Sequence, residues 1–253
     1  MLPETEIVHG IHADFLCFKT NDFISNHIRE KGIWGEAELN LALLFSDGME
    51  KPLILDIGAN LGAFSIPVAK ILSSADATVY AFEAQRIVFQ QLCANAILNR
   101  LGNVVACHAA VGSSAGIARI PKVDCENTLN IGAVSQLPEI QKVSQVAYSE
   151  TEHEEIRMIS IDSLGLEGRC TCVKIDVEGF ESEVISGMLG FLEKILSLRF
   201  FLKSREKENS AALPAPKSKC GKPAREICFQ NLGTIFGCWE RMSLRSIRTR
   251  PHE

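Results

Sequence analysis

The chain lacks paired cysteines of the kind that bind metals or form disulfides. Its nine cysteines are odd in number, and no two of them form a C-x-x-C pair. This spacing does not favour a structural zinc site. Cys170 and Cys172 would share one face of a strand, which favours core packing over disulfide pairing. Cysteine usage therefore predicts a reducing, cytoplasmic environment.

Long apolar runs and an excess of basic residues are also missing. No apolar segment has the length needed to span a membrane, and the N-terminus shows no secretory pattern, so we expect no membrane partner. The net charge of -5 argues against a nucleic-acid partner, because such proteins usually carry a basic excess. The charge is uneven. Residues 1–198 hold 14 basic and 26 acidic side chains, whereas residues 199–253 hold 12 and 5.

Short apolar runs alternate with amphipathic segments through most of the chain. Buried strands are predicted at 53–57, 78–82, 104–107 and 172–177, and helices near 62–72, 86–99 and 181–188. Strand–helix–strand order with short joins implies right-handed crossovers. The predicted fold class is therefore α/β, with a Rossmann-like, doubly wound and mostly parallel sheet.

Composition divides the chain into three parts. Residues 1–50 suggest a small cap made of a hairpin and helices, and residues 51–202 form the core. Residues 203–253 form an atypical basic tail, rich in Lys, Ser, Pro and Ala, which we expect to be partly disordered.

Some local elements are less regular. The hairpin of the cap is expected at 7–19. Asn21 and Asp22 are candidate caps for a helix with three apolar residues on one face, Phe23, Ile24 and Ile28. The polar stretch 124–155 is predicted to form loops. The segment 198–202 is expected to be a fifth strand of the sheet.

The segment DIGANLG at 56–62 joins the first buried strand to a helix start. Its glycines let the backbone come close to a ligand, and a helix start offers unpaired N–H groups. Such a turn is typical of sites for nucleotide-like ligands. The carboxylate of Asp56 would repel a pyrophosphate but suits a cationic ligand, or a ribose and an amino group. The turn therefore favours S-adenosylmethionine (AdoMet) over a dinucleotide.

Glu83 follows the second predicted strand, 25 residues beyond Gly58. An acidic residue at this place can accept hydrogen bonds from both ribose hydroxyls. The alternative is a solvated glutamate at a strand end. The combination with the turn at 56–62 favours the ribose-binding role.

The segment KIDVEGFE at 174–181 places acids at the end of a further strand. In an open α/β sheet, ligands bind beyond the carboxyl ends of the strands. Asp176 and Glu178 there can accept a proton from a substrate hydroxyl or bind a hard cation. Glu181 is better explained as a helix N-terminal charge. His108 and His153 are expected to be solvated or packing residues and not catalytic groups.

These motifs together resemble the FkbM-type AdoMet-dependent methyltransferases. The order and spacing of four segments match, namely DIGANLG at 56–62, FEA at 82–84, IDSL at 161–164 and KIDVEGFE at 174–181. GIWGE at 32–36 and AVG at 110–112 also fit the family. The resemblance covers residues 12–198, but the family's helix and hairpin are missing after the fifth strand.

The resemblance implies a class I methyltransferase fold and methyl transfer to a hydroxyl, usually on a sugar or small metabolite. The residues Asp56, Gly58, Asn60 and Gly62 would then line the methionine part of AdoMet. Glu83 would bind the ribose and Ala84 would flank the adenine, with Val111 also in the cofactor site. Asp176 and Glu178 would face the methyl-transfer site as the catalytic pair.

Several alternatives stay open at this point. A nicotinamide or flavin oxidoreductase would need G-x-G-x-x-G, which residues 58–62 do not provide. A non-catalytic descendant that binds a cofactor or a partner would fit the irregular C-terminus. A divalent metal near Asp176 and Glu178 is possible, but the sequence supplies no clear third ligand. The expected partner is a small hydroxylated acceptor, and the sequence leaves the oligomeric state open.

The segments 1–50 and 108–155 would cover the open side of the cofactor and select the acceptor. They carry few aromatics and no basic cluster. A large aromatic acceptor or a polyphosphate acceptor is therefore not favoured.

Overall fold

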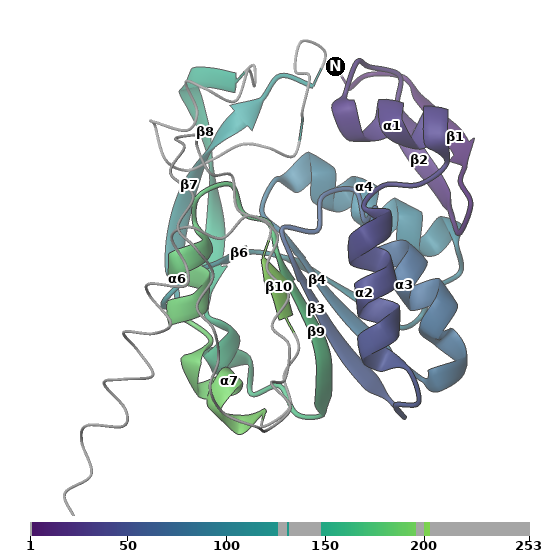
Figure 1. The fold of residues 1–253 in the computed structure, drawn as a ribbon. Coiled ribbons are helices and arrows are strands. Elements are labelled where there is room, and N and C mark those ends of the chain that lie inside the picture. The colour runs from purple at the N-terminus through teal and green to yellow at the C-terminus, as the bar shows by residue number, and fades with distance from the viewer. Residues whose placement is uncertain (1, 126–130, 132–147, 196–199, 203–253) are drawn as a thin grey trace, which may run out of the picture.

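A computed structural model describes residues 2–125, 131, 148–195 and 200–202 (Figure 1). The basic segment 203–253 and most of 126–147 lie outside these residues, so the predicted tail and part of the predicted loops stay predictions. Within the described ranges, no helix combines the length and apolar character that crossing a membrane would require.

A five-stranded parallel sheet forms the centre of the molecule. Its strand order is β10-β9-β3-β4-β5. The strands are β3 (Pro52–Ile57), β4 (Thr78–Glu83), β5 (Val104–His108), β9 (Arg169–Ile175) and β10 (Phe200–Leu202). Every residue of β3 is buried, as expected for a strand covered on both faces. Along the chain, β4 and β5 are added on one side of β3, and β9 and β10 are then added on its other side. The strand order therefore switches between β3 and β9, and ligands bind at such a switch point in this class of fold.

Helices cover both faces of the sheet (Figure 1). One face carries α2 (Glu36–Ser46), α3 (Ser65–Ile71) and α4 (Arg86–Leu98). The other carries α6 (Glu181–Ser186) and α7 (Leu189–Lys194). Alternate residues of β3 divide between the two cores: Leu55 packs with Val184 of α6, while Ile54 packs with Leu39 of α2. The predicted doubly wound, parallel α/β fold is confirmed.

The predicted helix near 62–72 is shorter than expected. Helix α3 begins at Ser65, and a 3₁₀ turn follows it at Leu72–Ala75. Likewise α6 ends at Ser186, before a separate helix starts at Leu189. A second 3₁₀ turn spans Ile161–Leu164. Gly62 has φ +91°, a conformation that cannot be part of an α-helix, so the first residues after the turn stay outside it.

A smaller three-stranded sheet lies beside the central one. Part of it is formed by residues that the sequence predicted to be loops. Its order is β6-β8-β7, formed by β6 (Ala110–Val111), β7 (Gly116–Val123) and β8 (Tyr148–Ile159). The stretch 148–155 is thus a strand and not a loop. Its acidic sequence shows no apolar alternation, but β7 supplies an antiparallel ladder. Lys122 of β7 also pairs with Glu152 of β8 at 3.2 Å.

The N-terminal segment forms a hairpin and a helix. The hairpin joins β1 (Thr5–His9) to β2 (Asp14–Phe18), and α1 (Phe23–Lys31) follows it. Asp22 caps α1 as predicted, because its carboxylate accepts the backbone N–H of Ser25 at 2.9 Å. The prediction for Phe23 is wrong. Its side chain is 59% exposed, while Ile24 and Ile28 are buried.

Side-chain amides on α4 fix the hairpin to the core. Asn99 exchanges two hydrogen bonds with the backbone of Asp14, and Gln91 donates to the carbonyl of Leu16. Asn95 accepts the N–H of Leu16 at 2.6 Å and donates to the carbonyl of Leu61 at 2.8 Å. These amide side chains thereby hydrogen-bond to backbone groups of β2 that a neighbouring strand would otherwise pair. Asn95 also links β2 to the turn after β3.

Asn95→Leu should destabilise the protein by about 2–4 kcal/mol, because a buried N–H and a buried C=O both lose their partner. Asn95 is fully buried, so water cannot replace it. Chemical denaturation measures the change in the free energy of unfolding. The matched control is Ile97→Ala on the same helix, where the side chain is 78% exposed. Equal stability of the two variants would contradict the bridging role of Asn95.

Candidate active site

A cleft lies at the carboxyl ends of the central strands. Its empty volume is about 580 Å³, a figure that includes space open to solvent. Each of four strands contributes residues that follow it: Gly58 after β3, Glu83–Gln85 at the end of β4, Ala109–Val111 after β5, and Asp176–Glu178 after β9. Ile120 of β7 and Phe180 complete the wall. Gly58, Glu83, Ala84, Val111, Asp176 and Glu178 are thus the predicted site residues that the structure brings together.

The backbone N–H groups of the turn at 58–62 are all donated to acceptors within the protein. The N–H groups of Gly58 and Ala59 both donate to the carbonyl of Phe82, at 3.0 and 2.9 Å. The remaining three are donated by Asn60 to Glu83, by Leu61 to the side chain of Asn60, and by Gly62 to Ala59. All five N–H groups of residues 58–62 are therefore paired within the protein, whereas the predicted unpaired N–H groups are those of the helix start that follows this turn.

Gly58 is required by the neighbouring strand. Its φ is +83°, and a Cβ there would lie 1.9 Å from the carbonyl oxygen of Asp176. The N–H of Asp176 donates to the carbonyl of Ile57 at 2.8 Å. The turns after β3 and β9 are thus in direct backbone contact, and together they form one side of the cleft.

Two predicted cofactor residues do not line the cleft. A Cβ at Gly62 would lie within 3 Å of Ile66 and Leu92, so this glycine allows the turn to pack on α3 and α4. Asn60 has φ +54°, and its side chain accepts the N–H of Leu61 at 2.6 Å. Both residues shape the turn, and their predicted contact with the methionine part of AdoMet stays a prediction.

Glu83 lies in the cleft as a nearly buried carboxylate. It is 5% exposed, and its two oxygens accept the N–H groups of Asn60 and Gln85 at 2.8 and 2.7 Å. Burial raises the pKa of Glu83 to about 7, although both hydrogen bonds oppose the shift. Because the carboxyl binds its proton more tightly when folded, it stabilises the protein below pH 4.5, and this contribution is lost as the pH rises through 7.

Asp56 does not line the cleft, and its predicted contact with the ligand stays a prediction. The residue is fully buried. One carboxylate oxygen accepts Lys174 Nζ at 2.9 Å, and the other accepts Ser65 Oγ at 2.6 Å. Burial raises the pKa of Asp56, against the opposing effects of Lys174 and Ser65.

Lys174 is the functional candidate that sequence reasoning missed. Its ammonium lies beneath the cleft, 2.9 Å from Asp56, 3.3 Å from the carbonyl of Gly58 and 3.8 Å from Asp176. Burial alone would lower the pKa of Lys174, but the carboxylates of Asp56 and Asp176 outweigh it and raise the pKa. The available signal was a lysine within the otherwise uncharged, buried run 170–175 of β9, since such a lysine needs a carboxylate partner.

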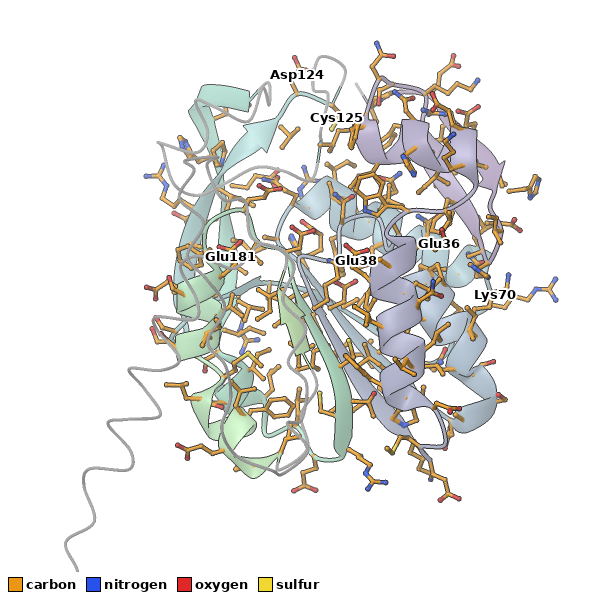
Figure 2. All side chains as sticks on the ribbon, viewed as in Figure 1. Glu36, Glu38, Lys70, Asp124, Cys125 and Glu181 are labelled. Atoms are coloured by element: carbon orange, nitrogen blue, oxygen red, sulfur yellow. The ribbon has the colours of Figure 1, made fainter. Side chains whose placement is uncertain are left out.

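The acids after β9 face the cleft in different ways. Asp176 lines it with a partly exposed side chain, and Glu178 follows with φ +52° in the turn. Glu181 is the first residue of α6 (Figure 2) and accepts the N–H of Gly179 at 3.2 Å. Its predicted role as a helix N-terminal charge fits this position. Within the described part of the chain, no three His, Cys, Asp or Glu side chains lie close enough to hold a metal.

His108 lies beside the cleft without lining it. Its Nε2 lies 3.1 Å from the carbonyl oxygen of Ala84, and its ring stacks on Phe89 at a centroid distance of 4.9 Å. The residue thus links the segments that follow β4 and β5, in line with the expected packing role.

Comparison with protein families identifies the chain. The model of the methyltransferase FkbM domain matches residues 56–214, more than half of the sequence. The chain belongs to the FkbM methyltransferase family. The match begins at Asp56 and includes every element that contributes a strand end to the cleft of this FkbM family member.

Solved structures similar to this FkbM family member are distant. Methyltransferase FkbM from Methylobacillus flagellatus KT shares 15% identity at a TM-score of 0.36, over 68% of this chain and 40% of its own. TYW2 from M. jannaschii in complex with AdoMet shares 15% at 0.28, over 48% and 64%. The SAM-dependent methyltransferase from Agrobacterium tumefaciens shares 18% at 0.31, over 41% and 32%. No curated protein matches the chain.

The chain therefore spans less than half the length of the Methylobacillus protein. The family assignment comes from the sequence match, and the site from the geometry of this chain.

Gly58→Ala should destabilise the protein by at least about 3 kcal/mol, because the new Cβ collides with the backbone of Asp176 and the residue has a positive φ. Gly48→Ala is the matched control. Gly48 also has a positive φ, but nothing lies within 4 Å of its would-be Cβ, so we expect a loss of only about 1 kcal/mol. Urea denaturation measures the free energy of unfolding of both variants. Equal losses would show that the contact with Asp176 does not add to the cost of a Cβ at position 58.

Proposed function

We propose that this protein is an AdoMet-dependent methyltransferase that methylates a hydroxyl of a sugar or another small metabolite. The observation that supports this proposal best is the negative charge of the side chains that line the cleft. Among the described residues that line it, the charged side chains are those of Glu83, Asp176 and Glu178. The adjoining turn at 58–62 has no spare N–H group for a phosphate. A cleft of this kind suits a cationic nucleoside better than a dinucleotide.

The residues present fit AdoMet at the ribose. Each oxygen of Glu83 accepts one backbone N–H, and a carboxylate oxygen has two acceptor positions. Glu83 therefore retains capacity for the two ribose hydroxyls. The apolar side chains of Ala84, Val111 and Ile120 line the same cleft and would flank the adenine.

AdoMet supplies an activated methyl group, so the protein needs to align the acceptor and help remove its proton. In this proposal, Asp176 would accept the proton of the acceptor hydroxyl. The oxygen of that hydroxyl would bond to the methyl carbon as the bond from this carbon to the sulfonium sulfur breaks, and the neutral thioether product would leave. Glu178, from the same turn, orients that hydroxyl. No side-chain nucleophile and no metal is needed for the reaction.

The acceptor and the setting are further parts of the proposal. The carboxylates that line the cleft disfavour an anionic acceptor, so a small neutral hydroxyl compound is the proposed partner. The protein would act without nucleic acid or membrane. The six cysteines in the described part of the chain are all free thiols, in keeping with a cytoplasmic location.

Glu83→Gln should weaken AdoMet binding about 10- to 100-fold, because the ribose hydroxyls would lose a charged acceptor. Isothermal titration calorimetry measures the affinity. Glu154→Gln serves as the control, since it removes a carboxylate that pairs with Arg86 and does not line the cleft. Equal affinity of Glu83→Gln and the wild-type protein would contradict the assignment of the ribose site.

Binding of AdoMet should also depend on pH. With the pKa of Glu83 at about 7, about 90% of the carboxyl is protonated at pH 6 and must lose its proton to bind ribose hydroxyls as an anion. We expect the affinity to be about tenfold lower at pH 6 than at pH 8. The same titration on Glu83→Gln should show no such dependence, and a flat profile for the wild-type protein would exclude this linkage.

Asp176→Asn should reduce methyl transfer by about 10²- to 10⁴-fold while AdoMet binding stays within about tenfold of the wild type. Transfer is measured as incorporation of labelled methyl from AdoMet into an extract of small metabolites. Transfer that persists in this variant would remove Asp176 from the mechanism. A wild-type protein that binds AdoMet but labels nothing would favour a non-catalytic cofactor-binding protein.

A further inference from the structure

Three charged side chains lie in a row beneath and beside the cleft. Lys174 Nζ is 2.9 Å from Asp56 Oδ1 and 3.8 Å from Asp176 Oδ2. Asp56 is fully buried, whereas Asp176 lines the cleft. The ammonium therefore makes its close ion pair on the buried side, and only a longer contact with the carboxylate that a ligand can reach.

The charges of this row leave a net negative charge at the Asp176 end of the cleft. Two carboxylates share one ammonium, and among the described residues that line the cleft none is Lys, Arg or His. Glu38 adds a further negative charge within electrostatic reach of Lys174. It comes from the first turn of α2, at the end nearest the cleft (Figure 2).

The position of Asp56 has a consequence for ligand charge. Without its carboxylate, Lys174 would keep Asp176 as its nearest charged partner, and the two charges would cancel at the surface of the cleft. AdoMet carries a positive sulfonium, whereas S-adenosylhomocysteine (AdoHcy), the product of methyl transfer, carries a neutral thioether. The two ligands otherwise share the groups that Glu83 and the apolar wall would recognise.

We propose that Asp56 is a specificity-determining residue that acts through Lys174. It holds the ammonium on the buried side, so that Asp176 keeps its negative charge toward the cleft and raises the preference for AdoMet over AdoHcy. The inference rests on the proposed AdoMet site. It gives the ion pair a role in selecting the donor over the product, which favours exchange of AdoHcy after each turnover. Asp56 is thus a positioning residue that does not touch the ligand.

A purely structural role makes a different prediction. If the pair only joined β3 to β9, its loss would weaken both ligands equally. If the pair sets the local charge, its loss changes the ratio of the two affinities, because only one ligand is cationic. A single unit charge near a partly solvated site changes the binding of a cation by about tenfold.

The test measures dissociation constants of AdoMet and AdoHcy by calorimetry at pH 8 for four proteins: wild type, D56N, the double variant K174M/D56N, and D76N. In D56N the preference for AdoMet over AdoHcy should fall about tenfold. In K174M/D56N it should return to the wild-type value, because both members of the pair have lost their charge. D76N removes the same charge at an exposed pair with Lys51, ahead of β4, and should leave the preference unchanged.

The outcomes separate the inference from the function on which it rests. A D56N variant that folds and keeps the wild-type preference would overturn the inference. If D56N does not fold, Asp176→Asn carries the test, because the inference places the deciding negative charge on Asp176, and an unchanged preference in that variant would overturn it as well. A wild-type protein that binds neither ligand would overturn the proposed function itself, and the inference with it.

Discussion

The contact between the turns after β3 and β9 governs the geometry of the site. The carbonyl of Asp176 lies where a Cβ of Gly58 would be, and the N–H of Asp176 bonds Ile57. Lys174 stabilises the same junction from below, because its ammonium donates hydrogen bonds to Asp56 and to the carbonyl of Gly58. A buried ion pair gains little net stability, since desolvation offsets the attraction. Here it fixes where two strand ends meet and which carboxylate faces the cleft.

A second set of contacts connects this junction to the N-terminal hairpin. The turn after β3 reaches Asn95 of α4 through the carbonyl of Leu61, and the same side chain holds β2. Glu83 binds the turn from β4 through the N–H of Asn60. The turn is therefore fixed by three neighbouring elements, β4, α4 and β9. Its rigidity suits a site whose chemistry depends on alignment more than on strong acids or bases.

Much of the fold follows from local sequence patterns. Mostly apolar runs predict strands such as β3, because a strand covered on both faces is apolar at nearly every position. The strand β8 could not be predicted in this way. Its acidic residues carry no alternation, and its pairing comes from β7, about 30 residues away along the chain. Long-range partners of this kind leave no trace in a local window.

The residues of the site also divide into those whose place the sequence predicts and those whose place depends on distant contacts. Glu83 and Asp176 follow buried strands, and the carboxyl ends of parallel strands meet at one edge of a sheet, so sequence position places both residues in the cleft. Asp56 and Gly62 lie in the same motif, yet one pairs with Lys174 and the other packs on α3 and α4. A motif identifies which residues the turn requires. It does not separate those that bind a ligand from those that hold the turn.

The burial of Asp56 also changes the reason for favouring a cationic ligand. The sequence suggests that this carboxylate repels a pyrophosphate directly, but it lies beneath the cleft with a cation beside it. In the turn itself, the N–H groups of residues 58–62 are donated to acceptors within the protein. A nucleotide-binding turn of the dinucleotide type keeps such groups for the phosphate. A turn that has used them leaves recognition to side chains, and among the described residues that line this cleft the charged side chains are acidic.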